Sequence, residues 1–167
     1  MSIYRKAFVL LITGAVCLLG FSGRAAGQVA GELPVVVAPM VSSKPVIDGR
    51  LDDAVWQRTD PTSLRSNTDI KIANPATQFR MYTDGSWLYV AITAADADAG
   101  TLDKQNLGRD NLQWQESLEV FISPEQDAAD YYHFAVDPGA TGYDTVGRAP
   151  ATDHDYNWQH AVTVGAD

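Results

Sequence analysis

A tryptophan and two carboxylates lie within a few positions of one another, at Trp114, Glu116 and Glu119. A flat indole ring can cover the apolar face of a pyranose, and carboxylates accept hydrogen bonds from sugar hydroxyls. Gln115 lies between them, and His133 follows further along, as additional polar candidates. This combination is typical of a sugar-binding site. The structural alternative is a half-buried tryptophan beside solvated acids at the start of a strand.

Residues 113–124, which contain the tryptophan and the carboxylates, are predicted to form a core strand. Leu118, Val120 and Ile122 alternate with residues of the opposite face, which is the period of two expected for a strand. Pro124 cannot donate to a ladder and is expected to end it. The candidate site is therefore placed at the beginning of a rigid element.

A second strand is predicted at residues 131–137, with His133 and Ala135 on the face away from the core. If this strand pairs with the first one as a hairpin, His133 lies beside Glu119. Residues 143–157 are expected to form a loop. A last strand is expected to begin at Trp158, whose ring is a second candidate surface for a sugar.

Short strands separated by turns rich in glycine and proline fill the rest of the chain. Residues 77–83 and 87–94 flank Asp84-Gly85-Ser86, a strong hairpin signal, and both faces of the second segment carry bulky side chains. Trp56 is interpreted as a core residue. Without a long segment of helical period, we predict one all-β domain, an antiparallel β-sandwich of jelly-roll or immunoglobulin-like type.

An acidic turn at Asp96, Asp98 and Asp103 is a candidate calcium site. It resembles the first half of an EF-hand loop, but the twelfth position is Leu107 instead of glutamate. The alternatives are a looser calcium site or a solvated loop.

The first 27 residues have the order of a secretory signal peptide: basic residues, an apolar run of about 15 residues, then small residues. The run is shorter than the roughly 20 residues that span a bilayer. We therefore expect cleavage and a secreted or periplasmic protein. Residues 28–43 are read as an extended lead-in, and residues 44–167 as the folded domain. Cys17, the only cysteine, belongs to the leader, so no disulfide is expected.

The chain is acidic, with a formal charge of −9. Without the leader, 9 basic and 21 acidic side chains remain, which gives −12. Such a surface repels nucleic acid and anionic lipid, and it suits neutral ligands and calcium. No second hydrophobic stretch predicts a membrane span.

Catalysis is not expected. The sequence has no Gly-x-Ser-x-Gly elbow, no His-Glu-x-x-His motif and no cysteine nucleophile after the leader. Glu116 and Glu119 could be considered an acid/base pair, but residues three apart on a strand point to opposite faces.

Four groups of residues, in order, resemble the family 9 carbohydrate-binding modules and their wider relatives. They are Ile47-Asp48-Gly49 with Leu51 to Trp56, Tyr82-Thr83-Asp84 with Leu88 to Ala91, Trp114 with Glu116 and Leu118 to Pro124, and Tyr132 to Val136 with Gly139 and Asp144. The resemblance covers roughly residues 44–167. It implies a calcium-containing β-sandwich that holds sugars at a chain end between tryptophans, without catalysis.

Within this resemblance, Trp114 matches the first stacking tryptophan, and Glu119 matches the carboxylate that binds sugar hydroxyls. Ala135 stands where the family has a sugar-contacting arginine. The second stacking tryptophan and the closing strand fall beyond Asp167, so the sandwich is expected to lack its last strands here.

Two functions follow from the sequence. The first is a secreted, non-catalytic module that binds a polysaccharide or oligosaccharide on an aromatic face. The alternative, favoured by the missing arginine and second tryptophan, is an extracytoplasmic structural or interaction domain of a larger outer-membrane or cell-surface protein.

Overall fold

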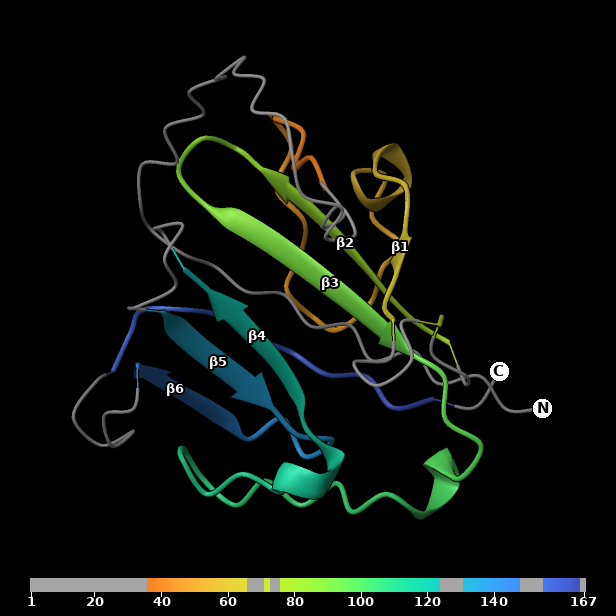
Figure 1. Ribbon diagram of the computed structural model, residues 1–167, viewed down its shortest axis with the longest axis vertical. Coiled ribbons are helices and arrows are strands. Elements are labelled where there is room, and N and C mark those ends of the chain that lie inside the picture. The colour runs from red at the N-terminus through yellow and green to blue at the C-terminus, as the bar shows by residue number, and fades with distance from the viewer. Residues whose placement is uncertain (1–35, 66–70, 73–75, 124–130, 148–154, 166–167) are drawn as a thin grey trace, which may run out of the picture.

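The computed structural model describes residues 36–65, 71–72, 76–123, 131–147 and 155–165 (Figure 1). The leader expected at residues 1–27 and the first half of the lead-in lie outside the described residues. Within the described part, no helix is long and apolar enough to cross a membrane.

The described residues form two antiparallel three-stranded sheets, which confirms the predicted all-β sandwich. The first sheet has the order β1 (Thr62–Ser63), β2 (Thr77–Thr83) and β3 (Leu88–Ala94). The second has the order β4 (Leu118–Ile122), β5 (Tyr132–Val136) and β6 (Gly142–Val146). Within the same described ranges, three short 3-10 helices accompany the strands: η1 (Trp56–Arg58), η2 (Ala99–Thr101) and η3 (Trp114–Glu116). Figure 1 shows β3 and β4 as neighbours, one from each sheet.

The main core lies between the two sheets. Val90 and Ile92 of β3 pack with Phe134 and Val136 of β5, and Trp158 completes the buried cluster. These side chains alternate along their strands with residues of the opposite face, as the period of two requires. Burial of each large apolar side chain contributes about 1.5–3 kcal/mol to folding.

The other face of the first sheet is also covered, as the bulk on both faces of β3 predicted. Tyr82 and Tyr89 stack at 4.6 Å between ring centroids, and Trp56 and Tyr82 form a T-shaped pair at 4.9 Å between centroids. Trp56 is 0% exposed, which confirms its interpretation as a core residue. In the β2–β3 hairpin, Asp84 Oδ1 accepts the backbone N–H of Ser86, and Gly85 has a φ of 88°.

Two predictions about the end of the chain were wrong. Residues 143–146, expected at the start of a loop, belong to strand β6, while the expected strand from Trp158 is absent from the described residues 155–165. Both errors involve Asp144, a carboxylate on the inward face of β6 that obscures the apolar alternation. It is 0% exposed and accepts hydrogen bonds from the backbone N–H of Tyr156, at 2.8 Å, and from Trp158 Nε1, at 3.0 Å. These side-chain contacts attach the C-terminal segment to β6.

Candidate functional site

The outer face of the β4–β5–β6 sheet carries a group of aromatic and polar side chains. They come from η3, from β4, from β5 with the residue before it, and from β6. We call this group the aromatic face; it consists of Trp114, Glu119, Phe121, Tyr131, His133 and Tyr143.

Trp114 lies on a 3-10 turn and not on the strand where the sequence placed it. The turn η3 is closed by Ser117, whose hydroxyl and backbone N–H both donate to the Trp114 carbonyl, at 2.9 and 3.4 Å. The strand begins one residue later, at Leu118. The turn raises the indole onto the sheet face, where the residue is 45% exposed.

A buried carboxylate fixes the start of this turn. Asp137, at the end of β5, accepts the backbone N–H of Gln113 at 3.1 Å and that of Thr141 at 2.9 Å. One side chain therefore anchors both the residue before Trp114 and the β5–β6 turn. This connection is rigid, because loss of either backbone donor would leave a buried carboxylate oxygen without a hydrogen bond and would lower the free energy of unfolding.

The rings of the aromatic face contact one another mainly through edges. Trp114 meets Tyr143 edge-to-face at 4.7 Å between centroids, with 74° between the planes, and it lies 6.0 Å from His133. Edge-to-face packing is favourable for aromatic pairs. It orients the half-exposed indole on the strand scaffold while leaving part of its surface in solvent.

Glu119 and His133 form the polar centre of the face, as the predicted hairpin implied. Strands β4 and β5 pair with Glu119 opposite Ala135 and with Phe121 opposite His133. In this register Nε2 of His133 lies 2.8 Å from Oε2 of Glu119. Burial lowers the pKa of the His133 imidazole, and the Glu119 carboxylate opposes that shift. A neutral imidazole with hydrogen on Nε2 would donate one hydrogen bond to the Glu119 carboxylate. The other lone pairs of that carboxylate would then accept hydrogen bonds from a ligand.

The remaining residues predicted for the sugar site lie in different surroundings. Gln115 is exposed and Glu116 is half-buried, and both belong to η3 with Trp114. Glu116 is therefore on a helical turn, and not on the strand with Glu119 that the sequence pattern predicted.

Trp158 lies in the core and away from the proposed sugar surface. It is 8% exposed, packs edge-on against Phe134 at 5.3 Å, and donates its indole N–H to Asp144. A ring in this position has no free face for a sugar. The expectation that Trp158 supplies a second stacking surface is corrected accordingly.

The acidic turn proposed for calcium uses its carboxylates for local backbone contacts. Asp96 accepts the N–H of Asp98 at 2.8 Å, and Asp103 accepts that of Gln105 at 2.9 Å. Across the described residues, no group of three or more histidine, cysteine or acidic side chains is placed to hold a metal ion. The carboxylates of Asp96, Asp98 and Asp103 are therefore not grouped around one point in the described structure.

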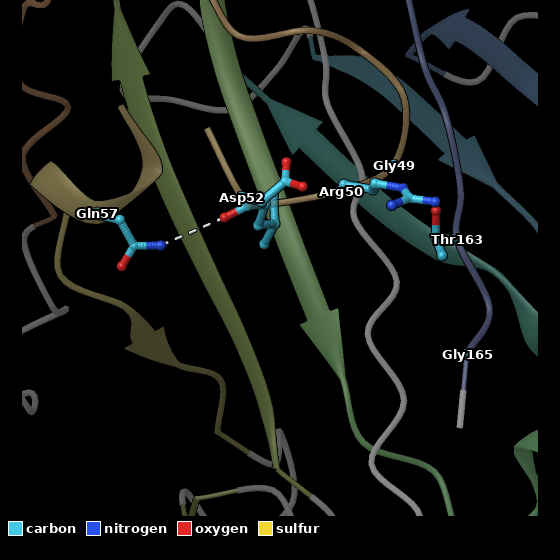
Figure 2. Close-up of a pocket in the computed structure, with 7 residues that line it drawn as sticks. Gly49, Arg50, Asp52, Gln57, Thr163 and Gly165 are labelled. Atoms are coloured by element: carbon cyan, nitrogen blue, oxygen red, sulfur yellow. Dashed lines mark hydrogen bonds between the residues drawn. The ribbon is translucent and has the colours of Figure 1, made fainter. Parts of the chain in front are cut away.

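A hollow of about 550 Å³ lies elsewhere, between residues 49–57 and the C-terminal segment (Figure 2). Gly49, with a φ of 83°, allows close approach to Thr163, and Gln57 donates to the Leu51 carbonyl at 3.5 Å. Its lining includes Arg50, Asp52 and Thr163 and no aromatic side chain. Because stacking needs a ring, this hollow is not the candidate sugar site.

Phe121, Tyr143 and Asp137 were missed as site residues. Phe121 could have been found, since it is a large aromatic residue on the non-core face of a predicted strand. Tyr143 could not, because β6 was taken for a loop. Asp137 acts through a contact with Gln113, 24 positions away, which no local pattern indicates.

Fold and site together define a β-sandwich with an exposed aromatic and acidic face. The family model "Carbohydrate family 9 binding domain-like" matches residues 47–166, and the chain belongs to this family. This confirms the resemblance inferred from the sequence motifs.

Two curated relatives are enzymes that contain a similar stretch. Exoglucanase XynX of Acetivibrio thermocellus is 33% identical over 107 residues, which cover 64% of this chain and 9% of the relative. Endo-1,4-beta-xylanase A of Thermoanaerobacterium saccharolyticum is 36% identical over 107 residues, covering 64% of this chain and 8% of the relative. The chain thus spans less than a tenth of either relative's length. No solved structure gives a significant match.

Proposed function

We propose that this domain is a secreted, non-catalytic module that binds a neutral polysaccharide or oligosaccharide on the aromatic face. The observation that carries the proposal is the half-exposed indole of Trp114 beside the Glu119–His133 pair. Membership of a carbohydrate-binding family supports it.

The geometry supplies the two kinds of contact that a sugar requires. The indole of Trp114 covers the apolar face of a pyranose ring, and Glu119 accepts hydrogen bonds from its hydroxyls. The Tyr143 edge and the Glu119–His133 contact hold these groups in place before the ligand arrives, which lowers the entropic cost of binding. With a small ligand and one open face, affinity is on the order of micromolar or weaker.

The choice of sugar follows the two relatives. Their names are those of an exoglucanase and a xylanase, so β-linked glucans and xylans are the first ligands to test. In both relatives the matched stretch is a small part of a longer enzyme. We propose by analogy that this module acts as an anchor for a larger extracellular protein.

Calcium remains a prediction of the family resemblance. An ion that binds only the folded state raises the unfolding midpoint. A higher midpoint in calcium than in a chelator would support the prediction, and identical midpoints would contradict it.

The proposal is tested by retention on insoluble cellulose and xylan. Trp114→Ala should abolish retention, and Trp114→Phe should keep part of it. Leu64→Ala changes an exposed apolar residue directly after β1 of the other sheet and should leave retention intact. Equal retention of wild type and Trp114→Ala would contradict the proposal.

A further inference from the structure

The aromatic face continues beyond Trp114 along the second sheet. Tyr143 pairs with Ala135, so the Trp114–Tyr143 contact marks one end of the face. Two residues further along the sheet, Phe121 lies opposite His133, and Tyr131 lies two residues beyond His133 on the same side. Phe121 is 57% exposed. Exposure of an apolar ring to water is unfavourable, and contiguous exposed apolar surface is typical of binding sites.

Ring contacts join these residues into one strip. Phe121 stacks on His133 at 4.1 Å between centroids, with 16° between the planes, and Phe121 and Tyr131 form a T-shaped pair at 5.7 Å between centroids. His133 in turn lies 6.0 Å from Trp114. We call Trp114, His133, Phe121 and Tyr131 the aromatic strip.

The strip is longer than one sugar. The strip extends over three successive ring contacts, with centroid distances of 5.7 Å from Tyr131 to Phe121, 4.1 Å from Phe121 to His133 and 6.0 Å from His133 to Trp114. A single pyranose ring occupies only part of that length. A ligand that contacts both ends of the strip therefore has at least two linked rings.

We propose that the aromatic strip binds consecutive sugar residues in the interior of a neutral polysaccharide chain, with Phe121 as a second stacking position. This inference rests on the proposed function and names its ligand class. It differs from the single terminal sugar that the family resemblance implies. Ala135, between Glu119 and Tyr143 in the sheet, is 0% exposed and has no polar side chain, so it offers no group to hold a terminal sugar.

Charge favours a neutral chain over an anionic one. The protein carries a formal charge of −9, and Glu119 lies on the face itself. An anionic polymer would be repelled, whereas hydroxyl groups can donate to this carboxylate.

Calorimetric titration with glucose to cellohexaose and xylose to xylohexaose tests the inference. Affinity in at least one series should rise with chain length and then level off once the strip is filled. Borohydride reduction of the terminal sugar should leave hexasaccharide affinity unchanged. If the hexasaccharide binds no better than the shortest ligand, or if reduction abolishes binding, the site takes a chain end and the inference fails.

Variants separate this inference from the proposed function. Phe121→Ala should weaken hexasaccharide binding roughly tenfold, equivalent to about 1.4 kcal/mol, and leave the shortest ligand that binds unaffected. Phe121→Tyr keeps the ring and should retain the affinity, and Leu64→Ala is the matched apolar control. Unchanged hexasaccharide affinity in Phe121→Ala, with Trp114→Ala still inactive, overturns the inference alone. Absence of binding of every sugar to the wild type overturns both.

Discussion

Nε2 of His133 lies 2.8 Å from Oε2 of Glu119, across the β4–β5 pair. The same imidazole stacks on Phe121 and lies near Trp114. This single side chain therefore connects the acid that would bind hydroxyls with the rings that would cover the sugar.

Replacement of the acid should change both binding and the histidine. Glu119→Gln removes a charge that raises the His133 pKa, so that pKa should fall further below its ordinary value, since burial then acts with less opposition. Sugar affinity should fall about tenfold, because a charge-assisted hydrogen bond is lost. NMR titration of the His133 ring measures the first effect and calorimetry the second. A raised pKa would contradict the assigned contact.

The anchor below Trp114 should act on binding without touching sugar. Asp137→Asn places an amide NH₂ group against one of the two backbone N–H donors, so one hydrogen bond is lost. The free energy of unfolding should therefore fall by about 2 kcal/mol. Because η3 loses its fixed start, affinity should fall even where the variant is fully folded. Urea unfolding and calorimetry below the unfolding midpoint separate these effects. Wild-type affinity in the folded variant would show that the anchor does not position Trp114.

Trp158 should affect stability and not binding. Trp158→Phe removes the N–H that donates to buried Asp144, and unfolding free energy should fall by about 2 kcal/mol. Its sugar affinity should equal that of the wild type, since the ring belongs to the core. Loss of sugar affinity in a stably folded Trp158→Phe protein would instead indicate that Trp158 contributes to the binding site.

Acid should weaken the fold through buried His133 and half-buried His160. Burial lowers the pKa of His160, next to Trp158, and that of His133, so the unfolded chain binds protons that the folded chain resists. Their stabilisation is complete above the ordinary histidine pKa of about 6.5 and is lost as pH falls through the lower folded values. Urea unfolding should therefore give a lower free energy at about pH 5 than at about pH 7.5. His160→Gln should reduce this difference, and an unchanged difference would exclude His160 as a source.

Local patterns predicted most of the fold. The alternation of β3, β4 and β5 and the Asp84-Gly85 turn are readable because each strand buries one apolar face against the core. Strand β6 was not readable, because its inward Asp144 is satisfied by donors from residues 155–165 and by an ion pair with Arg109.

The centre of the candidate site was predictable for a related reason. The hairpin pairing of β4 with β5 brings Glu119 and His133 together, and the pattern of both strands indicated it. The position of Trp114 on a 3-10 turn, its contact with Tyr143 and its anchor at Asp137 depend on tertiary contacts. Sequence periodicity does not contain that information.

The indole N–H signals of the four tryptophans test the central claim most directly. In a two-dimensional NMR spectrum of labelled protein titrated with cellohexaose or xylohexaose, the Trp114 signal should move most. Trp56 and Trp158, which are buried, and Trp87, which packs on the other sheet, should stay nearly in place. A saturable shift of another tryptophan with Trp114 unmoved would contradict the account.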